Sequence, residues 1–111
     1  MKVWQRAKGL AVNVYAVVKK SPGLAKDFGL RDQMQRAAVS VCSNIAEGDE
    51  RDTDKEAVRC FYIAKGSVAE LITQLEIAKD ARLIKAGPAD QLIKEAEEIG
   101  AMLGALIKAR A

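Results

Sequence analysis

The sequence predicts an all-α protein that folds as an antiparallel up-down-up-down four-helix bundle. Apolar residues recur at three- and four-residue spacing in four long segments, which is the period of an amphipathic helix. Short connections separate these segments, and short connections favour antiparallel neighbours. The chain has 111 residues, half of them hydrophobic, which is enough for one core. We therefore expect a single domain over residues 1–111.

The first helix is expected over Val3–Lys20. Its apolar arc covers nearly half of the circumference, whereas a helix with one neighbour needs a narrower stripe. The arc therefore indicates burial against two neighbours or against another subunit, with Trp4 and Tyr15 expected in the core. Pro22 ends this helix because proline cannot donate to a continuing ladder, and a loop is expected over residues 24–29. The arc consists of Val3, Trp4, Ala7, Leu10, Ala11, Val14, Tyr15, Val17 and Val18.

The other three helices are delimited by capping and turn residues. The second is expected over residues 30–50. The third starts after Thr53, which forms a capping box with Glu56, and it ends near Asp80. The fourth begins at Gly87-Pro88, where proline occupies a favoured first position, and it continues to the C-terminus. Small residues that permit close helix approach lie at Ala37, Ala38 and Gly48.

The composition argues against most enzyme classes. The chain has no histidine, which removes the commonest general base and the commonest zinc ligand. It has no glycine-rich phosphate loop. The acidic stretch at residues 49–54 does not match a calcium loop, because Arg51 occupies a ligand position and the central glycine is missing. Cys42 and Cys60 are interpreted as small buried hydrophobes. We expect no metal, no cofactor and no enzymatic activity.

Apolar runs are too short to span a bilayer, and the N-terminus does not resemble a signal peptide. We therefore expect a cytoplasmic protein that makes no membrane contact. The formal net charge is +3, and its distribution is uneven. The first helix carries five basic residues and no acidic one, and these are Lys2, Arg6, Lys8, Lys19 and Lys20. A helix with one sign of charge is a candidate footprint for phosphate, although a solvated helix flank explains the pattern as well.

A polar stripe runs beside the apolar stripe of the second helix, at spacings of three or four residues. The stripe comprises Gln33, Arg36, Ser40, Asn44, Glu47 and Arg51. In an antiparallel hairpin it faces a second polar line, which comprises Ser67, Glu70 and Gln74. We expect an Arg36–Glu70 ion pair between the two helices, with hydrogen bonds from Ser40 and Asn44 nearby. The stripe either sets helix register and subunit pairing or lines a ligand groove, and the residues alone favour the structural role.

At these residues the chain resembles the four-helix-bundle family of 23S ribosomal RNA intervening sequence proteins. The resemblance covers nearly the whole chain, and its most specific part is the run Asn44–Gly48, followed by Gly66-Ser67. The similarity extends to the accessory variability determinant proteins of diversity-generating retroelements. The chain departs from the family at Arg82-Leu83, where a glycine followed by an aromatic residue is common. The remaining matches are Phe28, Gly29, Leu30, Gln33, Arg36, Ala37, Ala38, Ser40, Arg51, Phe61, Ala64, Glu70, Gln74 and Leu75.

The resemblance implies a bacterial cytoplasmic protein without established enzymatic activity, assembled as a ring of five bundles. It leads to the hypothesis of a non-enzymatic oligomer that binds RNA or DNA through the basic surface of the first helix. Arg51, Lys55 and Arg59 are candidates to join that surface. The alternative is a protein-interaction scaffold or an accessory subunit for a polymerase such as a reverse transcriptase. A third hypothesis, an RNA-processing enzyme, needs a metal, for which only Glu47, Asp49, Asp52 and Asp54 are candidate ligands.

Overall fold

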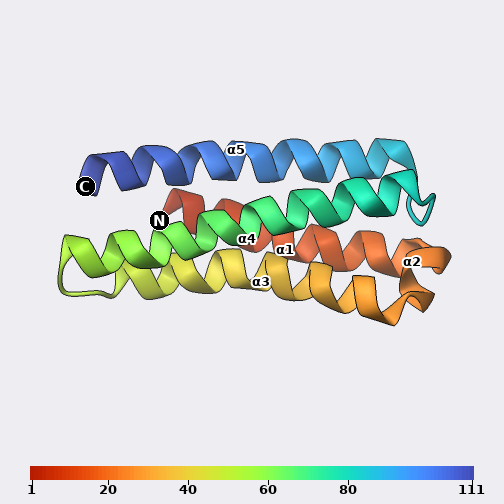
Figure 1. Cartoon of the computed structure of the whole chain (residues 1–111), viewed down its shortest axis with the longest axis horizontal. Helices are drawn as coiled ribbons and strands as arrows, with labels where there is room; N and C mark the ends of the chain where they lie inside the picture. The colour runs from red at the N-terminus through yellow and green to blue at the C-terminus, as the bar shows by residue number, and fades with distance from the viewer.

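The computed structural model describes residues 1–111 and contains five α-helices and no strand. Four long helices lie side by side along the long axis of the molecule, and each long helix runs opposite to the next (Figure 1). The bundle measures 44 × 20 × 19 Å. The expectation of an all-α protein is confirmed. The helices are α1 Lys2–Lys20, α2 Pro22–Lys26, α3 Phe28–Asp49, α4 Asp54–Asp80 and α5 Ala86–Arg110.

The connection between the first two long helices differs from the expected loop, because residues 22–26 form the short helix α2. Pro22 occupies its first turn, where a missing N–H costs nothing, and Leu24 is fully buried. Asp27 then starts α3, since its side chain accepts a hydrogen bond from the backbone N–H of Leu30 at 3.1 Å. Carboxylates are favoured N-caps, so α3 begins at Phe28, two residues before the expected start.

The long helices form a closed cycle of contacts, in which α1 and α4 each pack against both α3 and α5. Two neighbours account for most of the wide apolar arc of α1. Leu10 and Val14 are fully buried and Trp4 is partly buried. Tyr15 was expected in the core, but 43% of it is exposed, as is 60% of Val12. The apolar arc of α1 is therefore wider than the surface that α3 and α5 bury. None of the helices combines the length and hydropathy that a membrane span requires.

The helix pair α3–α4 is tightly packed where α3 ends. The Thr53 hydroxyl accepts a hydrogen bond from the Glu56 N–H at 3.2 Å, as half of the expected capping box. A Cβ atom added at Gly48 would lie 2.6 Å from Cε1 of Phe61, and Phe61 is fully buried in the core. Only a glycine at this position allows α3 to pack directly on the aromatic ring.

Replacing Gly48 by Ala is expected to destabilise the fold, because the new methyl group would overlap the Phe61 ring. Overpacking of this kind typically costs about 1–3 kcal/mol. Gly66→Ala is the matched control, since no atom lies within 4 Å of its added Cβ. That change should stabilise α4 by about 0.5–1 kcal/mol. Urea denaturation midpoints of both variants would test the assignment, and equal shifts of one sign would contradict it.

Candidate functional site

A polar cleft of about 230 Å³ lies between α3 and α4. We call it the polar cleft, and its lining residues are Gln33, Arg36, Ala37, Ser40, Ser67, Glu70 and Gln74. Six of these were assigned to the interhelix network from the sequence. The spacing of three or four residues on each helix keeps them on one face, and the antiparallel hairpin sets the two faces opposite each other. Ala37 has no side chain beyond Cβ, which leaves space between the helices.

One hydrogen bond joins the two helices at one end of the polar cleft, and two more within α3 support it. The Ser40 and Ser67 hydroxyls lie 2.8 Å apart, and either can donate. Asn44 donates from Nδ2 to the Ser40 carbonyl oxygen at 2.9 Å and to the Ser40 hydroxyl at 3.1 Å. Ser67 is buried, so its hydroxyl needs this partner. The bonds expected from Ser40 and Asn44 are therefore present.

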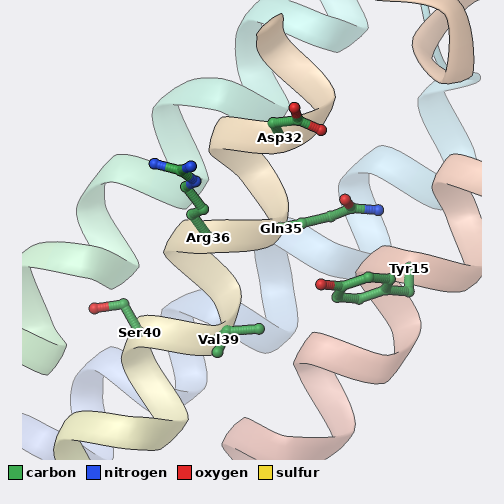
Figure 2. Close-up of a pocket in the computed structure, with 6 residues that line it drawn as sticks. All are labelled: Tyr15, Asp32, Gln35, Arg36, Val39 and Ser40. Atoms are coloured by element: carbon green, nitrogen blue, oxygen red, sulfur yellow. The ribbon is translucent and has the colours of Figure 1, made fainter. Parts of the chain in front are cut away.

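The expected Arg36–Glu70 ion pair is wrong. Both residues line the polar cleft. The chain has five salt bridges with N–O distances of 4 Å or less, and none of them joins Arg36 to Glu70. Both side chains are exposed, and exposed ion pairs contribute only about 0–1 kcal/mol, so solvation competes with pairing. Figure 2 shows Arg36 and Ser40 projecting toward α4, whereas Gln35 and Val39 project toward α1. The sequence therefore predicted which residues of α3 and α4 face the same cleft, but it did not predict whether the Arg36 and Glu70 side chains touch.

Gln74 is the unusual member of the polar cleft. Only 8% of the residue is exposed, and its Oε1 atom is the one buried side-chain polar atom of the chain that lacks a hydrogen-bond partner. A buried acceptor without a donor costs about 1–3 kcal/mol. An amide at this position is therefore a cost to the free protein.

A second cleft of about 370 Å³ lies at the α3–α4 turn and contains the remaining network residues. Arg51 forms an ion pair with Glu47, one turn earlier. Hydrogen bonding to the Cys60 side chain and to Glu47 raises the pKa of Arg51. Of the two arginines in this cleft, Arg51 is thus paired with a carboxylate. Its lining residues are Asn44, Glu47, Arg51, Glu56, Arg59, Cys60 and Ile63. Lys55 is exposed nearby on the first turn of α4.

The acidic residues proposed as metal ligands at this turn do not gather. No group of three or more histidine, cysteine, aspartate or glutamate side chains in the chain could hold a metal ion. Asp54 instead lies 3.8 Å from Arg110 of α5, measured from Oδ1 to Nη1. Glu47, Asp49 and Asp52 are exposed.

The five basic residues of α1 do not form one surface. Arg6 donates to Glu98 of α5 at 2.6 Å, on one flank of the helix. Lys8 and Lys19 line a groove on the other flank, between α1 and α3, and the Lys8 ammonium lies 5.5 Å from the centre of the Trp4 ring. Lys2 lies exposed in the first turn of α1, and Lys20 faces a different cavity. The idea of a uniform basic face on α1 therefore needs revision.

A cavity of about 710 Å³ lies at the end of the bundle where α1 meets the α4–α5 connection. We call it the basic cavity, because Lys20, Lys79, Arg82 and Lys85 line it and no acidic residue does. Lys79 donates to Asp90 at 2.8 Å, and this hydrogen bond raises the pKa of Lys79. The lysine therefore stays charged throughout the neutral range. The remaining lining residues are Val17, Ser21, Pro22, Gly23, Leu83, Ile84, Ala86 and Pro88.

Arg82 has a backbone φ of 61° and is the only non-glycine residue of the chain with positive φ. Left-handed backbone suits glycine far better than arginine. This is the position where the family resemblance led us to expect a glycine. The chain thus places a guanidinium at the mouth of the basic cavity in a backbone conformation that is costly for arginine.

Charge is unevenly distributed along the bundle. Residues 19–26 and 79–90, at the end that holds the basic cavity, contain six basic and two acidic side chains. Residues 47–59 and 105–111, at the opposite end, contain six acidic and five basic side chains, and Arg110 lies 3.8 Å from Asp54. The molecule is 44 Å long, several times the screening length of about 8–10 Å in physiological salt. The electrostatic attraction of an anionic partner to one end is therefore screened from the charges at the other end. The sequence carried this signal in Lys79, Arg82 and Lys85, but only the fold joins them to Lys20.

The flank of α1 that faces α3 carries an apolar groove of about 450 Å³. Val12, Tyr15 and Val39 are exposed along it, and Figure 2 shows Tyr15 and Val39 facing each other across the two helices. Burial raises the pKa of the Cys42 thiol in this groove, while Lys8 lowers it to a smaller extent. The apolar groove consists of Lys8, Ala11, Val12, Tyr15, Ala16, Lys19, Val39, Cys42 and Ser43.

Residues 1–105 match the model of the family described as 23S rRNA-intervening sequence protein. The chain belongs to this family. A similar solved structure is a protein of unknown function from the S23 ribosomal protein family of Bacteroides thetaiotaomicron VPI-5482. It is 22% identical, the match covers 96% of this chain and 98% of that one, and the TM-score is 0.89. At this identity the likeness shows the fold alone. No curated protein matches the chain.

Replacing Gln74 by Met is expected to raise stability, because the unsatisfied amide is removed while an unbranched side chain of similar size is kept. The free energy of unfolding should increase by about 1 kcal/mol. Ser67→Ala is the comparison, since it breaks the Ser40–Ser67 hydrogen bond and should lower stability by about 1 kcal/mol. Chemical denaturation of both variants provides the measurement. A destabilised Gln74→Met protein would show that Oε1 is satisfied in solution.

Proposed function

We propose that this protein is a non-enzymatic RNA-binding member of its family, and that it contacts the phosphate backbone through the basic cavity. The observation that carries the proposal is the cavity itself, which four cationic side chains and no acidic one line; three of them, Lys20, Arg82 and Lys85, form no salt bridge, while Lys79 is paired with Asp90. Lysine and arginine side chains supply the phosphate contacts of nucleic-acid-binding proteins. The family description, which refers to 23S rRNA, favours RNA as the polyanion. A ribosomal RNA partner corresponds to a cytoplasmic location.

The proposal changes the surface that was expected from the sequence. Lys20 remains in it, while Arg6 is paired with Glu98 and Lys8 lies in the apolar groove. Arg51, Lys55 and Arg59 lie at the other end of the bundle, among six acidic side chains. Contacts to phosphate alone carry little sequence information. We therefore expect binding that depends on salt and varies little among phosphate backbones of the same shape.

The variant Lys20→Ala, Arg82→Gly, Lys85→Ala should bind a structured RNA hairpin more weakly at every salt concentration. Each lost phosphate contact lowers the slope of log K against log salt by about 0.7–0.9, so the slope should fall by about 2. Glycine is used at position 82 because it tolerates positive φ, which keeps the fold intact. The measurement is a fluorescence anisotropy titration at several salt concentrations.

The matched control is the variant Arg51→Ala, Lys55→Ala, Arg59→Ala, which removes the same charge from the opposite end. It should retain most of the affinity and the salt slope of the wild type. If both variants lose affinity equally, net charge rather than the basic cavity governs binding. If the wild-type protein does not bind RNA even at low salt, the proposal is overturned, and a protein partner becomes the better explanation.

We also propose that the chain assembles into a homo-oligomeric ring, for which the family resemblance implies five subunits. The apolar groove between α1 and α3 supports this, because exposed Val12, Tyr15 and Val39 lie together there. The exposed apolar residues Tyr62, Ile63 and Ile77 lie on α4, which is opposite α1 in the cycle of helix contacts. Two different faces that join head to tail generate a closed ring when the rotation closes.

Val12→Glu should convert the assembled protein into monomers, because a carboxylate would lose its hydration in the apolar contact between subunits. Ala101→Glu, at an exposed position of α5, is the control with the same charge change and should leave the assembly intact. Sedimentation velocity across a range of protein concentrations measures both. A wild-type protein that sediments only as a 12 kDa monomer would refute the ring.

A further inference from the structure

The polar cleft contains three groups whose hydrogen-bonding or charge capacity is unused. Gln74 Oε1 is buried and has no donor. Glu70 and Arg36 each lack an ionic partner within 4 Å, although both line the same cleft as Gln74. Buried polar groups are satisfied in the great majority of native structures. The exception here lines the same cleft as an exposed carboxylate and an exposed guanidinium, both of which are accessible to a ligand that reaches Gln74.

The two helices contribute opposite chemistry to this site. On α4, the Glu70 carboxylate and the Gln74 carbonyl oxygen are hydrogen-bond acceptors, one turn apart. On α3, the Arg36 guanidinium is a donor. The Ser40–Ser67 hydrogen bond closes one end. A ligand must therefore donate along one edge and accept along another.

We propose that the polar cleft binds an unpaired guanine base of RNA, an inference that rests on the RNA-binding function proposed above. The N1–H and N2–H groups of guanine are adjacent donors, which match one carboxylate, here Glu70. The second N2 proton supplies the donor that Gln74 Oε1 lacks. The O6 and N7 atoms are the acceptors that arginine binds as a pair, and Arg36 fills that role. Unpaired RNA bases are read along these two edges.

The other bases match the site less well. Adenine presents its N1 acceptor to the Glu70 carboxylate, which would repel it. Uracil has one N–H between two carbonyl oxygens, and cytosine has one amino group beside two acceptors. Only guanine places two donors side by side with two acceptors on the next edge. The volume of about 230 Å³ is below the range of about 300–1,000 Å³ that accommodates larger ligands, so the cleft has room for a base and leaves the ribose and phosphate outside.

The test uses guanosine, because a nucleoside carries no phosphate and so does not report on the basic cavity. Guanosine is titrated into the ¹⁵N-labelled protein, and amide resonances along residues 33–40 and 67–74 are followed by NMR. These resonances should shift with guanosine. Inosine lacks the N2 amino group and so loses both N2–H hydrogen bonds, one to Glu70 and one to Gln74 Oε1. It should bind about tenfold to a hundredfold more weakly. Adenosine should produce no shift there.

Two variants connect the shifts to named atoms. Glu70→Gln preserves size but replaces a double acceptor by an amide, and it should reduce the preference for guanosine over adenosine to the part that Arg36 contributes through O6 and N7. Gln74→Met removes the orphan acceptor while strengthening the fold, so loss of binding in this variant cannot arise from unfolding. The difference in affinity between guanosine and inosine should become smaller in this variant, because only the N2–H contact to Glu70 still distinguishes them. The variant Lys20→Ala, Arg82→Gly, Lys85→Ala is the control and should bind guanosine as the wild type does.

The outcomes separate this inference from the proposed function. If RNA binds at the basic cavity while guanosine, inosine and adenosine behave alike, the guanine site is overturned and RNA binding stands. If guanosine shifts the cleft resonances but RNA does not bind, the cleft holds a free purine, and the assignment to RNA is overturned. If glycine, a zwitterion with a donor and an acceptor group, produces the same shifts as guanosine, the base assignment is overturned as well.

Discussion

The close packing of α3 on α4 determines the rest of the structure. Gly48 lets the end of α3 lie directly on the buried ring of Phe61, and the two helices stay near enough further along for the Ser40 and Ser67 hydroxyls to meet at 2.8 Å. A wider separation would break that hydrogen bond and open the interface to water. The same small residues that permit close approach also leave space, because Ala37 does not fill the gap that becomes the polar cleft. The small residues of α3 thus account both for the close α3–α4 packing and for the polar cleft.

The antiparallel arrangement explains how a chain of modest net charge acquires a strongly basic end. Lys20 closes α1, while Lys79, Arg82 and Lys85 surround the connection from α4 to α5, and these segments are nearly sixty residues apart in sequence. Cations at the C-terminal ends of helices are also favoured by the negative end of the helix dipole, which applies to Lys20 and Lys79. Local helix energetics and polyanion recognition therefore favour the same charges.

Much of the fold could be predicted from the sequence, because the period of the apolar residues and the caps are local signals. The third long helix began after Thr53 as expected, since a hydroxyl accepting from Glu56 N–H is specified within four residues. The short helix after Pro22 was missed because it depends on the burial of Leu24, a tertiary effect. The Arg36–Glu70 pair was wrong because register fixes which residues face each other but not whether exposed side chains meet. The basic cavity was missed because its members meet only through the topology.

The polar cleft suggests why the chain keeps residues that its own stability does not favour. An apolar side chain in place of Gln74 would avoid the cost of a buried acceptor without a donor, and glycine in place of Arg82 would adopt the positive φ without the strain that a Cβ atom causes. Both costs are borne at positions that face a cavity, while the core residues around them are packed without such compromise. Stability lost at a few positions is the usual signature of a site shaped by an external partner. By that criterion we propose the polar cleft and the basic cavity, rather than the charged face of α1, as the two functional surfaces of this bundle.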